Sequence, residues 1–439
     1  MDLRRPIAGA LLLLGACSDP TGPGAAGALR IVPGQKTVEA GAQVQFLAVR
    51  LSRYGDTLAA PGVLWSSSDP DIASVSADGR VSAHRTGAVT IVALLSTERA
   101  TASVDVQRRF KASAVAVGSS HVCALDLAGK AWCFGQDGSG SLGLGTFGEF
   151  RPTMSSPVIA APTFTAITVG LSASCGLSTD RQAWCWGSNF SNGLGHFPRR
   201  QDSAVPVLAD TLRTYEFISS GSSNVCGLSV GELYCWGSVY REPGAQLTSL
   251  QFSYISVGAF DACGVTTDGN AVCWHVSQLN IATGPAAPRF TRVSTSEDWD
   301  ARGPYVCGIA VDATLYCWGK NTHGQLGDGS TESRDAPAPV SSNHRFTDIK
   351  THSNYACGLT DAGVALCWGA NDHGQLGRGD STAALVPQLV DTPARFTTIS
   401  MNPGTGAGPL RELVCAISTE NDLYCWGEDS GPTPTPVLY

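Results

Sequence analysis

The stretch Cys357-Gly358-Leu359, followed by Cys367-Trp368-Gly369-Ala370-Asn371 and by Gly374-Gln375-Leu376-Gly377, decides the fold because the chain repeats it. A close copy of this pattern occupies residues 307–327. From residue 108 onward, seven units share a frame of two cysteines, and Trp-Gly usually follows the second cysteine. Because a repeat of this size marks one supersecondary unit that stacks on its neighbours, the repeats determine the architecture of this region.

Cysteines mark the repeat most clearly, and the chain has 15 of them. Fourteen fall into seven local pairs, one in each unit, and Cys17 is left over. So many cysteines predict an oxidising compartment. The pairs are Cys123 and Cys133, Cys175 and Cys185, Cys226 and Cys235, Cys263 and Cys273, Cys307 and Cys317, Cys357 and Cys367, and Cys415 and Cys425.

The spacing inside each pair fits a β-hairpin in which the two cysteines face each other. Three residues then form the loop, as in Thr267-Asp268-Gly269, and a left-handed residue such as Gly or Asn is favoured in the last position. Units two and five have Arg181 and Ala313 there, which predicts strain or a shifted turn. The shorter third unit has the two-residue turn Val230-Gly231. Opposed cysteines of this kind are close enough for a disulfide.

Zinc binding and free thiols are the alternatives to these disulfides. Zinc sites need close ligand pairs such as Cys-x2-Cys, and the sequence has none. We therefore expect seven local disulfides and no metal site. By restricting the unfolded chain, each loop of about ten residues should add roughly 3 kcal/mol of stability.

Composition and charge narrow the remaining classes of protein. The net charge is −8, and Lys and Arg are scattered without a basic run, so nothing predicts binding to nucleic acid. Glycine is abundant, with 50 residues, and there are 10 tryptophans, which suits short strands and tight turns. With units of roughly 37 to 58 residues and about four short strands each, the repeats predict an all-β, seven-bladed β-propeller over residues 108–439.

The repeated sequence pattern is Cys-Gly-Leu…Cys-Trp-Gly…Asn-x-x-Gly-Gln-Leu-Gly. Over about 330 residues, these repeats resemble the regulator of chromosome condensation repeat family. The resemblance implies a seven-bladed propeller. The terminal segment Pro434-Thr435-Pro436-Val437-Leu438-Tyr439 looks like the last strand of a repeat, and we expect it to complete the blade that begins near Ala112. Units three and four lack the Gly-Gln-Leu-Gly loop, so we expect trimmed outer edges in those two blades.

The N-terminus resembles a bacterial lipoprotein signal over residues 1–16. Two arginines precede a short apolar run, which ends in Leu14-Gly15-Ala16-Cys17. The resemblance implies acylation of Cys17 and a lipid anchor in the bacterial cell envelope, and Ser18 favours the outer membrane or cell surface. An ordinary secretory signal is the alternative. Residues 17–28 should form a flexible tether, and no other segment approaches the length of a membrane helix.

Residues 29–107 show a second all-β pattern. Alternating segments such as 44–49, 72–75 and 89–93 are separated by polar turns, and Ala77-Asp78-Gly79-Arg80 has the composition of a hairpin turn. This pattern indicates a small β-sandwich. The run from Trp65 to Ile91 resembles the group 2 bacterial immunoglobulin-like domains, whose members act mostly as spacers or adhesive modules. We expect Trp65 to be a core aromatic of the sandwich.

Catalytic and cofactor motifs are missing from the sequence. It has no nucleophile elbow, paired-histidine helix or Walker-type loop. Gly138-Ser139-Gly140-Ser141-Leu142-Gly143 fits a dinucleotide fingerprint by letter, but it falls in the Gly-Gln-Leu-Gly register of the repeat. We therefore predict no catalytic residue and no cofactor. The histidines should cap loops, pack or hydrogen-bond, and the tryptophans after the second cysteine should pack the blades: His121, His323 and His373, and Trp186, Trp236, Trp274, Trp318, Trp368 and Trp426.

Two irregular insertions are the candidate binding loops. Strand alternation places the loop after each aromatic strand and the loop after each Cys-Trp-Gly on the same face of the ring. On that face, unit five inserts Asp298, Trp299 and Arg302, and unit seven inserts Arg411 and Glu412. Loops that vary on a rigid scaffold carry recognition, and Trp and Arg dominate interface energetics. An insertion that only covers its own blade is the alternative.

These features favour a non-enzymatic binding or scaffold protein with an unknown protein partner in the envelope or the extracellular space. Within the resembling family, eukaryotic members act as nucleotide exchange factors for a small GTPase, and a secreted bacterial member inhibits β-lactamases. Exchange activity does not suit an exported chain, whereas inhibition or adhesion does. The alternatives are a propeller enzyme for extracellular glycans, which would need acids or histidines converging on the central channel, and a structural envelope component.

Overall fold

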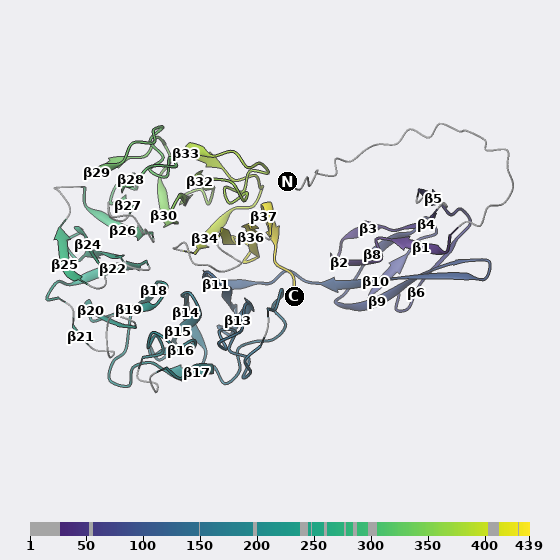
Figure 1. The fold of residues 1–439 in the computed structure, drawn as a ribbon, viewed down its shortest axis with the longest axis horizontal. Coiled ribbons are helices and arrows are strands. Elements are labelled where there is room, and N and C mark those ends of the chain that lie inside the picture. Colours follow the sequence, from purple (N-terminus) through teal and green to yellow (C-terminus); the bar gives the residue numbers. More distant parts are fainter. Residues whose placement is uncertain are drawn as a thin grey trace, which may run out of the picture. The chain divides into compact units, whose positions relative to one another are not determined.

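The structure is a computed structural model. It describes residues 27–51, 56–148, 150–195, 200–237, 245–246, 248–258, 261–275, 278–283, 288–296, 305–402, 412–428 and 430–439. The chain divides into two compact units, Met1–Arg108 and Arg109–Tyr439. Both units are built from β-strands (Figure 1). Within the described ranges, no helix is long and apolar enough to cross a membrane.

The N-terminal unit is the predicted immunoglobulin-like sandwich. Its sheets have the strand orders β1-β4-β5, β2-β10-β9-β6 and β3-β8-β7. The strands are β1 (Leu29–Val32), β2 (Gln35–Glu39), β3 (Gln43–Gln45), β4 (Leu47–Leu51), β5 (Thr57–Ala59), β6 (Leu64–Ser67), β7 (Ala73–Val75), β8 (Arg80–Ala83), β9 (Gly87–Leu95) and β10 (Glu98–Gln107). Apolar residues alternate along β9 and β10, and their inward set forms the core.

The segment 44–49, predicted as one strand, is divided between two sheets. β3 ends at Gln45 and β4 begins at Leu47, and Phe46 between them is fully buried. The Phe46 backbone N–H donates to the carbonyl of Gly79 over 2.9 Å, so the chain changes sheet without leaving this donor unpaired. Trp65 packs against the same core but is only half-buried.

The second unit is a ring of seven β-sheets, and in Figure 1 they surround a common axis. The innermost strands are β11 (Ala112–Val117), β14 (Phe164–Val169), β18 (Phe217–Ser220), β22 (Phe252–Val257), β26 (Phe290–Thr295), β30 (Phe346–Thr351) and β34 (Phe396–Met401). The second strands are β12 (His121–Asp126), β15 (Ala173–Ser178), β19 (Asn224–Ser229), β23 (Asp261–Thr266), β27 (Val306–Ala310), β31 (Tyr355–Thr360) and β35 (Leu413–Ser418).

The third strands carry the second cysteine of each unit. They are β13 (Ala131–Gly135), β16 (Ala183–Gly187), β20 (Glu232–Gly237), β24 (Ala271–His275), β28 (Leu315–Gly319), β32 (Ala365–Gly369) and β36 (Leu423–Gly427). Six blades have an outer strand: β17 (Ser203–Leu208), β21 (Ala245–Gln246), β25 (Gln278–Thr283), β29 (Arg334–Pro339), β33 (Ala384–Leu389) and β37 (Gly431–Pro436). Each blade is therefore an antiparallel meander from the axis outward.

The two cysteines of every unit lie opposite each other on the second and third strands. All seven pairs form disulfides, with Cα atoms 4.0 to 4.1 Å apart. The predicted hairpin geometry and the disulfide bonds are therefore both present. Each blade therefore has one disulfide, which joins its second and third strands close to the hairpin turn.

The hairpin turns also connect neighbouring blades. Arg181 and Ala313 adopt the left-handed conformation, with φ of 62° and 69°, so the turn is not shifted in the two units that lack Gly or Asn. The carbonyl of Ala313 accepts a hydrogen bond of 2.9 Å from the N–H of Phe346, the first residue of the next inner strand. The same bond occurs at all seven junctions, from the donors Ala112, Phe164, Tyr215, Phe252, Phe290, Phe346 and Phe396. At every junction the accepting carbonyl belongs to the left-handed residue at the end of the turn.

The prediction for ring closure was wrong. The terminal strand β37 pairs with β36, so it completes the seventh blade and not the first. The first blade has three strands, and its outer edge consists of isolated bridges from Trp132 to Pro157 and from Gly135 to Arg151. The N–H of Ala112 closes the ring by donating to the carbonyl of Asn421 over 2.8 Å. The ring is therefore closed by the same hydrogen bond as at every other junction, without a C-terminal strand that completes the first blade.

The prediction of trimmed outer edges was wrong for the fourth blade. In the third blade, the described part of the outer strand, β21, has two residues, and residues 241–244 and 247 beside it lie outside the described residues. In the fourth blade, β25 has six residues, because His275 pairs directly with Gln278 across a connection of two residues. An outer strand that follows so closely needs no Gly-Gln-Leu-Gly loop to bring it beside the third strand.

Candidate functional site

A central channel runs along the axis of the propeller. Its volume is about 490 Å³, and all seven innermost strands line it. Two residues of each strand alternate inward, and the one nearer the strand end lies opposite the first cysteine. The channel therefore contains two rings of seven equivalent positions. Each inner strand begins at the face that carries the cysteine hairpins, so the first ring is nearer that face.

The second ring consists mostly of hydroxyl residues, namely Ala116, Thr168, Ser219, Ser256, Ser294, Lys350 and Ser400. Five of these hydroxyl oxygens accept a hydrogen bond of 2.9 to 3.3 Å from a backbone N–H of the following blade. These bonds hold the innermost strands together beside the channel. Ala116 has no hydroxyl for this role, and Lys350 has an ammonium group instead.

The first ring is uneven, with Ala114, Ala166, Phe217, Tyr254, Arg292, Asp348 and Thr398 in blade order. Its aromatic and charged members come from consecutive blades. The Arg292 guanidinium carbon lies 5.4 Å from the centre of the Tyr254 ring, and the Phe217 and Tyr254 rings are 5.1 Å apart. This part of the channel thus combines an apolar wall with a cation.

Lys350 and Asp348 form an ion pair inside the channel, with Nζ to Oδ1 of 2.9 Å. Burial opposes the charged form of Lys350, but the carboxylate of Asp348 outweighs it and raises the pKa of the lysine. The lining therefore has two cations, Arg292 and Lys350, and one carboxylate, a formal charge of 2 − 1 = +1. The whole chain has a net charge of −8, so the channel is opposite in sign to the protein.

The charged residues of the channel were not predicted from the sequence. The repeat is defined by positions that recur, whereas Arg292, Asp348 and Lys350 differ from their counterparts in other units. Setting the seven aromatic strands side by side would have shown them as departures from a ring of small and hydroxyl residues.

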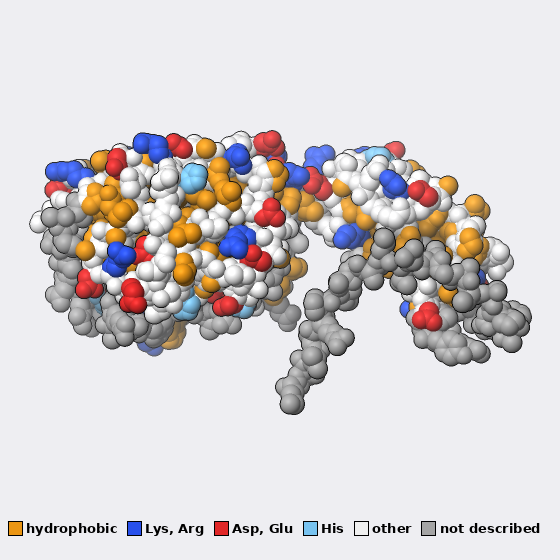
Figure 2. Space-filling view, turned by 90° about the horizontal axis from the view of Figure 1, so that it is seen from above, with side chains coloured by type: hydrophobic (Ala, Val, Ile, Leu, Met, Phe, Trp, Pro, Cys, Tyr) orange, Lys and Arg blue, Asp and Glu red, His pale blue; other side chains and the backbone are white. Residues whose placement is uncertain are grey.

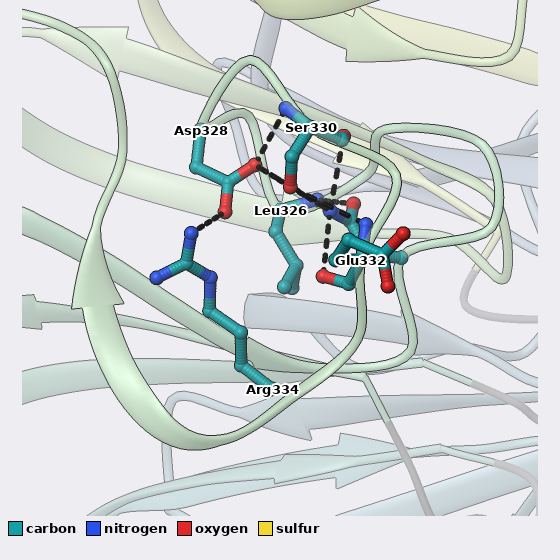
Figure 3. A network of polar contacts seen from close by, with 6 residues as sticks. Leu326, Asp328, Ser330, Glu332 and Arg334 are labelled. Carbon is teal, nitrogen blue, oxygen red and sulfur yellow. Dashed lines mark hydrogen bonds and ion pairs between the residues drawn. The ribbon is translucent and has the colours of Figure 1, made fainter.

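The loops after the third strands lie on the opposite face, and in the second, fifth and sixth blades an asparagine side chain accepts a backbone N–H within the loop. In the fifth blade, Asn321 Oδ1 accepts the N–H of Leu326 over 2.9 Å, and its amide nitrogen contacts Ser330 and the carbonyl of Glu332 (Figure 3). Asp328 completes the network with an ion pair of 2.6 Å to Arg334. Burial opposes ionisation of Asp328, but hydrogen bonds from Ser330 and the charge of Arg334 lower its pKa overall. The conformation of this loop is therefore held by side-chain hydrogen bonds and an ion pair.

His121 has the packing and hydrogen-bonding role expected from the sequence, whereas the loop contacts at His323 and His373 are made by their backbone N–H groups. His121 is fully buried, and its Nε2 lies 2.6 Å from the hydroxyl of Ser174. Burial lowers the pKa of His121 to about 3, so the ring is neutral at physiological pH. The backbone N–H groups of His323 and His373 donate to the side-chain oxygens of Gln325 and Gln375 over 2.8 and 2.9 Å. These contacts stabilise the loops.

Two connections on the loop face are much longer than the others. Five of the connections between first and second strands have three residues, whereas β26 to β27 has ten (296–305) and β34 to β35 has eleven (402–412). At the base of the first, the N–H of Ser296 donates to the carbonyl of Tyr305 over 3.2 Å. At the base of the second, Gln375 Nε2 donates to Glu412 Oε2 over 3.3 Å. The insertions therefore begin and end on fixed positions.

Most of the predicted partner-binding residues lie outside the described residues, namely Asp298, Trp299, Arg302 and Arg411. Cys17, the predicted lipid attachment site, also lies outside them. Glu412 is described, and its side chain is 14% exposed, with His352 Nδ1 3.9 Å from its Oε2. The structure thus places Glu412 in the base of the insertion, where little of its carboxylate is accessible.

Charges are mixed on the side of the propeller drawn in Figure 2, where acidic and basic side chains are interspersed with hydrophobic ones. Within the described residues, no group of three or more His, Cys, Asp or Glu is arranged to hold a metal ion.

Family comparisons agree with this architecture. Residues 26–106 match the bacterial Ig-like domain (group 2). Residues 112–141, 312–359 and 362–401 match the regulator of chromosome condensation (RCC1) repeat. The chain therefore carries a group 2 bacterial Ig-like domain followed by a propeller of RCC1 repeats.

Individual relatives share the repeat region. The chain is 28% identical over 235 residues to the human E3 ubiquitin-protein ligase HERC2, a match that covers 52% of this chain and 4% of that protein. It is 24% identical over 250 residues to the ultraviolet-B receptor UVR8 of Arabidopsis thaliana, covering 51% of this chain and 56% of the receptor. The matched region thus spans only part of each relative.

Two solved structures show the same propeller fold. Prp20p from Saccharomyces cerevisiae has a TM-score of 0.61 and 16% identity, covering 71% of this chain and 87% of Prp20p. Human WBSCR16 has a TM-score of 0.58 and 15% identity, covering 71% of this chain and 90% of that chain. At these identities the likeness establishes the fold alone.

Proposed function

We propose that this protein is exported to the bacterial cell envelope, is anchored there by a lipid on Cys17, and binds another protein through one face of its propeller without catalysing a reaction. Seven intrachain disulfides fit an extracellular or envelope protein. The Leu14-Gly15-Ala16-Cys17 sequence supports the anchor. A partner at the cell surface or in the periplasm follows from this location.

The two long connections on the loop face carry the proposal. Elsewhere the repeats keep this connection at three residues, whereas it has ten residues in the fifth blade and eleven in the seventh, which interrupts a regular scaffold at these two places. Hydrogen bonds fix their bases, as at Ser296 and Glu412. Variable loops on a rigid support are the usual location of recognition residues. Trp299 and Arg302 then act as the main contacts, since these residue types dominate interface energetics.

The channel does not favour the alternative of a glycan-hydrolysing enzyme. Such enzymes use a pair of carboxylates on either side of the bond to be broken. Among the described residues that line the channel, Asp348 is the single carboxylate, and Lys350 neutralises it.

Affinity capture from the native envelope tests the proposal. The lipidated protein is purified from its own membrane, and bound proteins are identified and quantified by mass spectrometry. We expect Trp299→Ala to reduce recovery of the partner by about tenfold or more, as for a central interface residue. Leu127→Ala is the matched control, because Leu127 is 60% exposed on the hairpin face. Unchanged recovery with Trp299→Ala, or a loss with Leu127→Ala alone, would contradict binding through the loop face.

A further inference from the structure

The channel has one asymmetric segment that the repeat does not explain. Across four consecutive blades, the inward positions hold Phe217, Tyr254, Arg292 and the Asp348–Lys350 pair, where other blades have alanine, serine or threonine. The hydroxyl residues stabilise the ring through hydrogen bonds to neighbouring strands. Neither Arg292 nor Lys350 takes part in those bonds. Their presence in the channel therefore calls for a role other than closing the ring.

Arg292 is available to a ligand. Its side chain is exposed to the channel, and within the described residues it makes no ion pair. Asp348, the one carboxylate of the lining, is held by Lys350 at 2.9 Å. A guanidinium group presents paired N–H donors that match the two oxygens of a carboxylate. The position is partly enclosed, so the electrostatic interaction is screened less than at the surface.

An apolar wall lies directly beside this cation. The Arg292 guanidinium is 5.4 Å from the centre of the Tyr254 ring, and Phe217 packs against the same tyrosine at 5.1 Å. The channel volume of about 490 Å³ lies within the range of small-ligand sites. An entering group would thus meet a positive centre and two aromatic rings together.

We propose that the hairpin-side half of the central channel is a binding site for a carboxylate carried on an apolar body. Arg292 binds the carboxylate, Lys350 adds to the positive potential, and Tyr254 and Phe217 contact the apolar part. The carboxylate belongs either to a free organic acid or to an acidic side chain inserted from a protein. This site is separate from the partner-binding face proposed above and does not depend on it.

Calorimetric titration of the purified, oxidised full chain tests the site with three probes. These are 3-phenylpropanoate, its uncharged amide, and the blocked peptide acetyl-Gly-Phe-Asp-Gly-amide. We expect saturable binding of the acid, with an affinity about tenfold or more higher than that of the amide. The reason is that only the acid can form an ion pair with Arg292. Tighter binding of the free acid assigns the site to a small molecule. Tighter binding of the peptide assigns it to a protein side chain.

Variants locate the binding within the channel. Arg292→Gln should weaken binding of the preferred carboxylate about tenfold. Arg292→Lys keeps the charge but loses the paired donors, so its affinity for the carboxylate should lie between those of Arg292→Gln and the wild type. Arg345→Gln is the control, because Arg345 is an exposed cation, paired with Asp361, that does not line the channel. Equal affinity for acid and amide, no saturable binding of any probe, or unchanged affinity in a folded Arg292→Gln protein would overturn the proposal.

Discussion

The indole Nε1 of Trp368 donates a hydrogen bond of 2.8 Å to the backbone carbonyl of Gln325 in the preceding blade. Trp186, Trp236 and Trp426 make the same bond to the preceding blade at 2.9, 3.0 and 3.1 Å. All four side chains are fully buried. The tryptophan after the second cysteine therefore joins the apolar core of one blade to the loop of another, which couples blade packing to the shape of the loop face.

Removing one of these indole bonds should destabilise the propeller. Trp368→Phe keeps most of the apolar surface but leaves the buried carbonyl of Gln325 without this donor, at a cost of about 1 to 3 kcal/mol. Trp274→Phe is the matched control, because the buried Trp274 Nε1 has no hydrogen-bond partner in the described part of the chain. Chemical unfolding of both variants should show the larger loss for Trp368→Phe. Equal losses would mean that only the ring packing matters.

At the left-handed turn positions, glycine should be more stable than alanine. Ala313→Gly should stabilise the protein by about 0.5 to 1 kcal/mol, because glycine adopts the φ of 69° without the cost that alanine carries. At the equivalent position of the next blade, Gly363→Ala should destabilise it, since a Cβ there lies 3.0 Å from the carbonyl oxygen of Phe396. Thermal unfolding measures both changes. Destabilisation by Ala313→Gly would show that the turn is not strained.

Each disulfide should contribute separately to stability. Replacing Cys357 and Cys367 together by alanine should lower the free energy of unfolding by about 3 kcal/mol, because the unfolded chain regains the freedom of a ten-residue loop. Cys17→Ala is the control, and it should leave the unfolding transition of the propeller unchanged. An unaffected transition in the double variant would show that packing alone determines the stability of that blade.

His121 should make the propeller sensitive to mild acid. The pKa of His121 is lowered to about 3 by burial, whereas an unfolded histidine titrates near 6.5. Between these two pKa values, His121 binds a proton in the unfolded state but not in the folded state. The free energy of unfolding that is present above pH 6.5 is therefore lost as the pH falls toward 3. Between pH 7 and pH 5 this linkage amounts to about 2 kcal/mol.

The variant His121→Gln isolates this contribution from that of other titrating groups. Unfolding of the wild type and the variant is measured by calorimetry at pH 7 and pH 5. The wild type should lose more stability than the variant over this interval. The same loss in both proteins would show that His121 is protonated readily in the folded state.

Local features of the propeller could be predicted because local spacing determines them. A sequence separation of ten places Cys357 and Cys367 across a hairpin, and the glycine at the end of that turn is favoured by its left-handed conformation. Ring closure depends on contacts between distant segments, and the sequence does not show that Ala112 bonds to Asn421. Phe46 was missed for a similar reason, since the pattern of residues 44–49 does not reveal a change of sheet.

The candidate channel site was missed for a different reason. A repeat is recognised by residues that recur, such as Trp368, whereas Arg292 and Lys350 occur once each in their rings. The lengths of the two insertions were visible in the sequence, and so was their placement on one face. The role of Glu412 at the base of an insertion depends on its contacts with His352 and Gln375, which only the folded chain brings together.

Intact-mass analysis of the protein from its native membrane tests the central claim most directly, namely that the chain works outside the cytoplasm as a disulfide-bonded ring on a lipid anchor. Without reductant, the mature chain should begin at Cys17, carry acyl groups, and have a mass lower by fourteen hydrogens than the reduced form, because seven disulfides are present. A chain with an intact N-terminus and alkylatable thiols at the paired cysteines would contradict the account.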